Sequence, residues 1–259
     1  MTMRNEINAV DLAFVVDTTG SMSSLIQAAQ NQMTAMLEQV TRAASINLWL
    51  GVVEYRDHPP QDKMLYKVYP FTADMQEAQK NIQLLQADGG GDGPEAVLDG
   101  ITAACRELAW WKHSRRLIIL VGDAPPHGVG MRGDAFPHGC PCGETIESVT
   151  FLAEEQRITI HALALTNQVT EAFRTISHLS GGKCFPAQQG DKAIEQIVAI
   201  LKAEFADIEL DRRVLDAWRA NPEIPLDDLA EQVRCTRYAA SSSLVRLLSR
   251  DLIEVPVVP

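Results

Sequence analysis

Carboxylate and hydroxyl side chains leave a predicted buried strand together near the start of the chain. Asp17, Thr19 and Ser21 stand two residues apart in the segment Asp-Thr-Thr-Gly-Ser, directly after the apolar run 10–16. A loop that offers only oxygen atoms suits a hard cation such as Mg²⁺. The same hydroxyls could instead cap a helix that starts near Met22, because serine and threonine are common capping residues. Two later loops favour the metal site.

Both later loops carry acidic side chains. One is Asp-Gly-Gly-Gly-Asp-Gly-Pro-Glu, which holds Asp92 and Glu95 and opens a predicted helix over 95–108. The other places Asp123 directly after the apolar run 117–121. Loops at the carboxyl ends of parallel strands meet in one crevice. We therefore expect the oxygen atoms of all three loops to gather there.

Together the three loops resemble the von Willebrand factor A (vWA) domain and its metal-ion-dependent adhesion site (MIDAS) in order, spacing and the D-x-T-x-S form. The resemblance implies that Thr19 and Ser21 bind a cation directly, and that Asp17 and Asp123 bind it directly or through water. The implied cation is Mg²⁺, with Mn²⁺ or Ca²⁺ as alternatives. Neutral hydroxyl ligands leave part of the cation's charge uncancelled, so it can attract an acidic side chain of a protein partner.

The second loop departs from the commonest family pattern, which has a threonine there. It resembles the variant of integrin β subunits, where a glutamate replaces the threonine, and the domain attached to some alpha-kinases. Counting back from Ile101 favours Glu95 as the ligand, and the shape of the loop also allows Asp92. An added carboxylate would hold the cation more tightly and weaken its attraction to an external acid.

An insertion after the third loop carries imidazole and thiol groups. Four of its residues have the types and number of a tetrahedral zinc site: His127, His138, Cys140 and Cys142. Only one residue separates the two cysteines, which is closer than the usual structural spacing. The alternative is a rigid, proline-rich loop with reduced thiols at the rim of the metal site. The start of the insertion, Asp-Ala-Pro-Pro-His-Gly, again resembles the alpha-kinase-associated domain, but no kinase domain is present to imply kinase activity.

The composition of the chain limits the classes of protein to which it can belong. With a net charge of −11, the chain of 259 residues is poorly suited to non-specific binding of nucleic acid or anionic membranes. No signal peptide or membrane-spanning segment is visible, and the 5 cysteines favour reduced thiols in a cytoplasm. We expect a cytoplasmic protein, closest to the bacterial or alpha-kinase-associated members of the family.

The order of apolar segments predicts an α/β fold. Near-continuous apolar runs are typical of buried parallel strands, and they cover 10–16, 48–53, 117–121 and 158–165. Short strands are expected at 67–71, on an edge, and at 181–185. Helical patterns alternate with these strands, which predicts a doubly wound, mostly parallel, Rossmann-like sheet of the vWA type.

The character of the sequence changes near residue 208, so we predict a vWA domain over 1–208 and a small module over 209–259, joined by a linker at 208–210. Three short helices are expected in the module, over 212–219, 226–233 and 238–250. With a strand at 252–255 they resemble a helix-turn-helix of the winged-helix type.

Three functions are compatible with these features. The first is a non-enzymatic, cation-dependent adaptor that binds a protein partner and works beside ATPases or kinases. The second is a transcriptional regulator that reads DNA through Arg234, Arg237, Arg246 and Arg250, although acidic residues leave the module without a basic face. The third is a metal-dependent hydrolase that uses Asp123 and His127. The sequence leaves the oligomeric state open.

Overall fold

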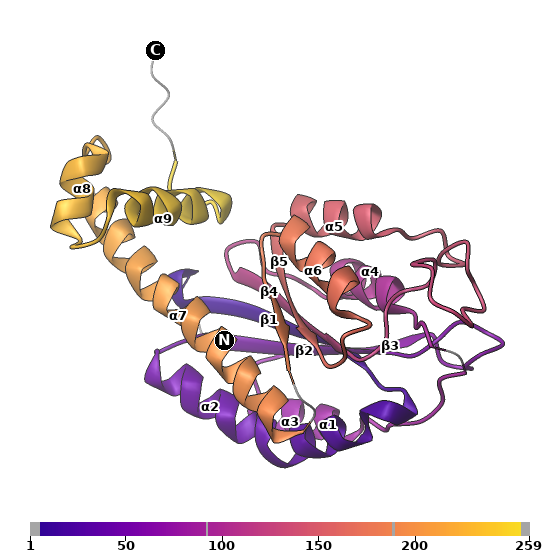
Figure 1. The fold of residues 1–259 in the computed structure, drawn as a ribbon. Helices are drawn as coiled ribbons and strands as arrows, with labels where there is room; N and C mark the ends of the chain where they lie inside the picture. The colour runs from indigo at the N-terminus through magenta and orange to yellow at the C-terminus, as the bar shows by residue number, and fades with distance from the viewer. Residues whose placement is uncertain (1–5, 92, 188–189, 255–259) are drawn as a thin grey trace.

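The fold is built on one twisted sheet with helices on both faces (Figure 1). A computed structural model describes residues 6–91, 93–187 and 190–254. Within these ranges the strands are β1 (Ala9–Asp17), β2 (Asn47–Tyr55), β3 (Tyr66–Thr72), β4 (Arg115–Gly122), β5 (Ile158–Ala164) and β6 (Cys184–Pro186), in the order β3-β2-β1-β4-β5-β6. Only β3 pairs antiparallel, at one edge. The predicted doubly wound, mostly parallel sheet is confirmed.

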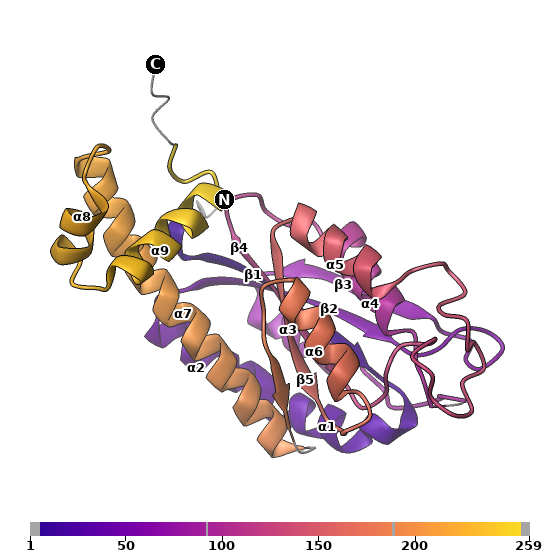
Figure 2. The same ribbon diagram turned by 45° about the horizontal axis from the view of Figure 1, so that its top comes forward.

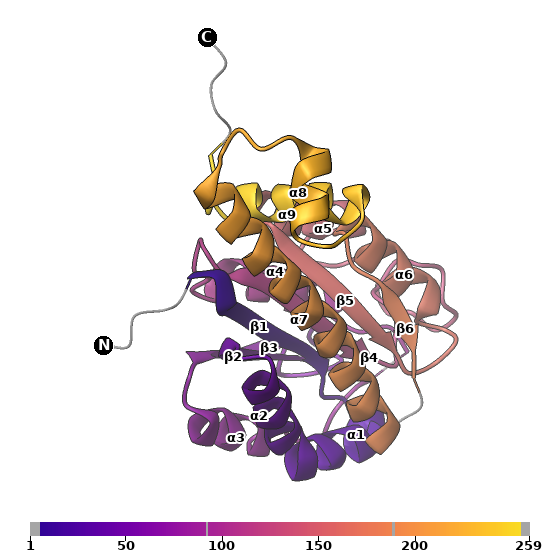
Figure 3. The same cartoon turned by 90° about the vertical axis from the view of Figure 1, so that its left-hand side faces the viewer.

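Each face of the sheet is covered by its own set of helices (Figure 3). One face packs against α1 (Ser23–Ala28), α2 (Thr34–Ala43), α3 (Met75–Gln83) and α7 (Asp191–Ala220). The other packs against α4 (Val97–Glu107), α5 (Ile146–Glu155) and α6 (Thr170–Leu179). Because β1 is covered on both faces, all of its residues are buried, which explains its apolar sequence.

The long helix α7 corrects the predicted linker. The structure has no break at 208–210, so the predicted domain boundary falls inside a continuous helix. Ile208 is buried with the core under the sheet, whereas Val214 and Leu215 belong to a separate apolar cluster with α8 (Leu226–Gln232) and α9 (Arg237–Ser249). One helix therefore serves both cores, and its apolar spacing continues without a helix-breaking residue.

The C-terminal module packs at the amino ends of the strands (Figure 2). Arg250 donates hydrogen bonds to the carbonyl groups of His113, just before β4, and of Ile7, just before β1. The expected wing strand is not observed: residues 252–254 form no strand, and residue 255 lies outside the described residues. None of the described helices is both long and apolar enough to cross a membrane.

Candidate metal centre

Backbone hydrogen bonds bring the three predicted metal loops together at the carboxyl ends of β1 and β4. The amide of Gly20 in the first loop donates to the carbonyl of Gly89 in the second at 3.2 Å. The amide of Glu95 donates to the carbonyl of Pro125 in the third loop at 2.9 Å. Main-chain contacts therefore bring the three loops together without the predicted metal-binding side chains, and we call their meeting place the cation crevice.

Asp17, the last residue of β1, is fully buried where these loops meet. Its Oδ1 accepts hydrogen bonds from the Thr19 amide at 2.8 Å and the Thr19 hydroxyl at 2.7 Å. The Thr19 hydroxyl lies 3.4 Å from that of the exposed Ser21. Asp17 Oδ2 has no hydrogen-bond partner among the residues that the structure describes. A buried carboxylate oxygen in this state is costly unless something binds it, and a cation would do so.

Glu95 is the second-loop acid that the structure places beside these candidate ligands. It is buried, at 3% exposure. A methyl group built on Gly90 would lie 3.1 Å from both Glu95 Oε1 and Thr19 Cβ, so the two side chains flank the same glycine. Asp92, the alternative ligand, lies outside the described residues.

The buried Tyr55 lies near the acidic residues of all three loops, and it was not identified from the sequence. Burial raises its pKa well above the usual value, and the charges of Asp17, Glu95 and Asp123 raise it further. Its hydroxyl passes so close to Gly122 that a β-carbon there would lie 2.6 Å away. The available signal was its position: Tyr55 ends β2 in register with Asp17 at the end of β1.

The electrostatics of this group of acids favour a cation. Burial raises the pKa of Asp17 to about 7, and the half-buried Asp123 adds to this while the hydrogen bonds from Thr19 oppose it. Negative charge is therefore poorly compensated at the crevice, and a bound divalent cation would stabilise the ionised acids. Oxygen donors of this kind fit Mg²⁺, Mn²⁺ or Ca²⁺.

The insertion after β4 does not assemble the predicted zinc ligands. His127 turns inward, with Nε2 2.7 Å from Asp57 Oδ1 and Nδ1 2.8 Å from Asp134 Oδ1, while His138 is exposed. The predicted combination of both histidines with the two cysteines is therefore wrong, because buried carboxylates outside the sequence motif occupy His127. Both ring nitrogens of His127 are engaged in these contacts, so its position does not support the hydrolase hypothesis that relied on it and Asp123.

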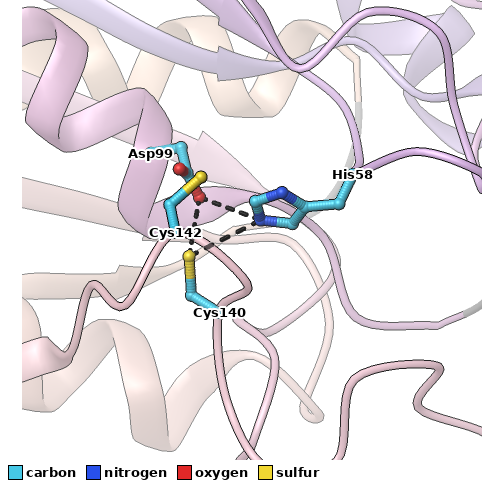
Figure 4. A group of neighbouring side chains, drawn as sticks. All are labelled: His58, Asp99, Cys140 and Cys142. Carbon is cyan, nitrogen blue, oxygen red and sulfur yellow. Dashed lines mark hydrogen bonds and ion pairs between the residues drawn. The ribbon is translucent and has the colours of Figure 1, made fainter.

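The two cysteines instead lie beside His58 and Asp99 (Figure 4). Asp99 Oδ2 lies 3.1 Å from both His58 Nε2 and Cys140 Sγ, and the latter two atoms are 3.5 Å apart. Cys142 completes a group whose ligand atoms all lie within 4.8 Å of one another. The sequence did carry one signal for Asp99: it is an acidic residue on the apolar, buried face of α4.

Known proteins are similar to this chain in sequence and in fold. A family profile described as von Willebrand factor A domain matches residues 11–189. Alpha-protein kinase vwkA of Dictyostelium discoideum is 29% identical over 143 residues, which cover 54% of this chain and 23% of the kinase. Von Willebrand factor A domain-containing protein 7 of Mus musculus is 26% identical over 222 residues, which cover 77% of this chain and 21% of that protein.

Among solved structures, proximal thread matrix protein 1 from the mussel byssus, with a zinc-occupied MIDAS motif, aligns with a TM-score of 0.54 and 16% identity over 75% of this chain and 46% of that chain. The matched segments span less than a quarter of the two curated relatives. The kinase match agrees with the alpha-kinase-associated resemblance, whereas the two curated relatives are eukaryotic and lend no support to a bacterial type.

Proposed function

Because this chain belongs to the von Willebrand factor A domain family, we propose that it binds a protein partner through a divalent cation at the carboxyl edge of its sheet. The observation that carries the proposal is the buried Asp17 Oδ2, which lacks a hydrogen-bond partner among the described residues. The other oxygen of the same carboxylate binds the Thr19 hydroxyl, which lies beside that of Ser21. Asp17, Thr19, Ser21, Glu95 and Asp123 would hold the cation.

The cation would supply a positive charge that attracts an acidic side chain of the partner. Ser21 is exposed while Asp17 and Glu95 are buried, so the partner would approach from the side of Ser21. A carboxylate at position 95, in place of a neutral hydroxyl, leaves less of the cation's charge uncancelled. We therefore expect a tightly held cation and a modest contribution of the cation to partner affinity. Mg²⁺, Mn²⁺, Ca²⁺ and Zn²⁺ should all be compared, since zinc occupies the MIDAS motif of the mussel protein.

Selection from a random peptide library on the immobilised full chain tests this function. In Mg²⁺, the enriched peptides should contain Asp or Glu, and a chelator should release them. Asp17→Ala should abolish the selection, whereas Arg237→Ala, on the exposed side of α9, should leave it unchanged. Binding that persists in chelator, or peptides that bind equally after their acids are changed to amides, would place recognition elsewhere.

We further propose that the C-terminal module docks protein and does not read DNA. Two of its four candidate DNA-binding arginines are used inside the molecule: Arg246 binds Asp211, and Arg250 binds the carbonyls of Ile7 and His113. The cation crevice and the C-terminal module lie at opposite ends of the strands, an arrangement that suits an adaptor with two partners. A gel-shift assay with genomic fragments checks this. A sequence-selective shift that Arg237→Ala removes would favour the transcriptional regulator.

A further inference from the structure

We propose that His58, Asp99, Cys140 and Cys142 form a zinc site that fastens the insertion after β4 to the body of the vWA domain. The ligands come from three separate segments: the loop after β2, the helix α4 and the insertion itself (Figure 4). This site is distinct from the cation crevice, to which none of the four side chains contributes.

The distances suit a tetrahedral zinc ion. With a Zn–S bond of about 2.3 Å and a Zn–N bond of about 2.0 Å, sulfur and nitrogen ligands lie about 3.5 Å apart. Cys140 Sγ and His58 Nε2 are 3.5 Å apart. Asp99 Oδ2 lies 3.1 Å from each of these atoms. To reach tetrahedral geometry, the distances from Asp99 Oδ2 to His58 Nε2 and to Cys140 Sγ would each need to increase by about half an ångström or less.

The chemistry of the ligands selects zinc over the hard cations of the crevice. Two thiolates and an imidazole are soft or intermediate donors, which Mg²⁺ and Ca²⁺ bind poorly and zinc binds well. Four protein ligands would fill the tetrahedral shell and leave no open position for water or substrate. The site is therefore structural, and we assign it no catalytic step.

The insertion is built to present its cysteines at a fixed place. His58 and Asp99 are buried, at 3% and 5% exposure. The Asp134 carboxylate, which holds His127, also accepts a hydrogen bond from the Gly128 amide at 2.8 Å. A β-carbon on Gly128 would lie 2.6 Å from the backbone of Gly139, so the two ends of the insertion touch just before Cys140. These contacts hold the two ends of the insertion together next to Cys140, which lies against the buried His58 and Asp99.

Cobalt substitution of the full chain tests the site, because tetrahedral Co²⁺ bound to thiolates has a charge-transfer band that oxygen ligands do not produce. The chain is purified under reducing conditions, stripped with chelator and titrated with Co²⁺ and then Zn²⁺. We expect a thiolate band that saturates at one equivalent and disappears when one equivalent of Zn²⁺ is added. Double substitution Cys140→Ser and Cys142→Ser should abolish the band.

Four single variants separate this site from its alternatives. His58→Ala and Asp99→Asn should weaken or shift the band, whereas His138→Ala, the ligand suggested by sequence, should not. Asp17→Ala should leave the band intact, which distinguishes this site from the cation crevice. Circular dichroism of each variant checks that the domain is folded.

Several results would overturn the proposal. One is the lack of a thiolate band in the reduced wild-type protein, which would mean that the cluster is held by hydrogen bonds alone. Another is a Cys140–Cys142 disulfide that persists under reducing conditions. A band that survives the double cysteine substitution, or one that is lost in His138→Ala but kept in the folded His58→Ala variant, would assign the metal to other ligands.

Discussion

Arg246 of α9 donates from one nitrogen, Nε, to both carboxylate oxygens of Asp211 on α7, each at 3.0 Å. Asp211 is fully buried and also accepts a hydrogen bond from Ser243 at 2.7 Å. Arg115, the first residue of β4, lies 3.9 Å from the same carboxylate. The buried carboxylate of Asp211 therefore links Ser243 and Arg246 of α9 to Arg115 at the amino edge of the sheet.

Replacing Arg246 with alanine should destabilise the protein by about 3 kcal/mol, because it leaves a buried charge without its main partner. Urea unfolding followed by circular dichroism measures this. The matched control is Arg237→Ala: Arg237 and Asp227 form a pair in which both side chains are more than two-thirds exposed, so we expect a change below about 1 kcal/mol. Equal effects of the two substitutions would contradict the structural role of the Asp211 contact.

Glu95→Gln should weaken Mg²⁺ binding more than Asp92→Asn does. Glu95 is buried beside Thr19, so the substitution removes a negative charge that would stabilise the cation directly and leaves a neutral, weaker oxygen donor in its place. Isothermal titration calorimetry of metal-stripped protein gives both affinities, and Asp17→Ala serves as the control in which the site is disrupted. A larger loss in Asp92→Asn would make Asp92 the coordinating acid.

His127→Ala should loosen the insertion after β4. It removes the imidazole that lies between Asp57 and Asp134, and it leaves these two buried carboxylates without their shared partner. Limited proteolysis should cut the variant within 124–143 several-fold faster than the wild type. His138→Ala, which changes an exposed histidine of the same insertion, should be cut at the wild-type rate. Identical cleavage of the two variants would show that His127 does not secure the loop.

Acid should destabilise the protein through Glu204 of α7. Burial acts to raise its pKa, but a hydrogen bond from His161 and the charge of Arg115 outweigh it and lower the pKa from its usual 4.5 to about 2. Because the unfolded chain takes up this proton first, the stabilisation is complete above pH 4.5 and is lost as the pH falls toward 2. Thermal unfolding across this range should show a shallower pH dependence in Glu204→Gln. A profile unchanged by that substitution would mean that other acids dominate.

The sequence by itself determined the sheet and the three loops of the cation crevice. Strands buried on both faces must be almost entirely apolar, so β1, β4 and β5 are visible as uninterrupted runs. The predicted metal-binding side chains directly follow such runs or open a helix, and parallel strands bring those positions to one edge whatever the remaining contacts are. For that reason Asp17, Thr19 and Glu95 could be predicted to lie close together, while their role as cation ligands stays a prediction.

Only the tertiary structure decided which partners the remaining polar groups have. Cys140 meets Asp99 and His58, which lie 41 and 82 residues earlier in the chain, and no local pattern relates them. His127 likewise pairs with Asp57, 70 residues away. The spacing of residues along a loop limits which of them can meet, but the buried groups of other elements compete for the same side chains, and the shape into which the whole chain packs determines which contacts form.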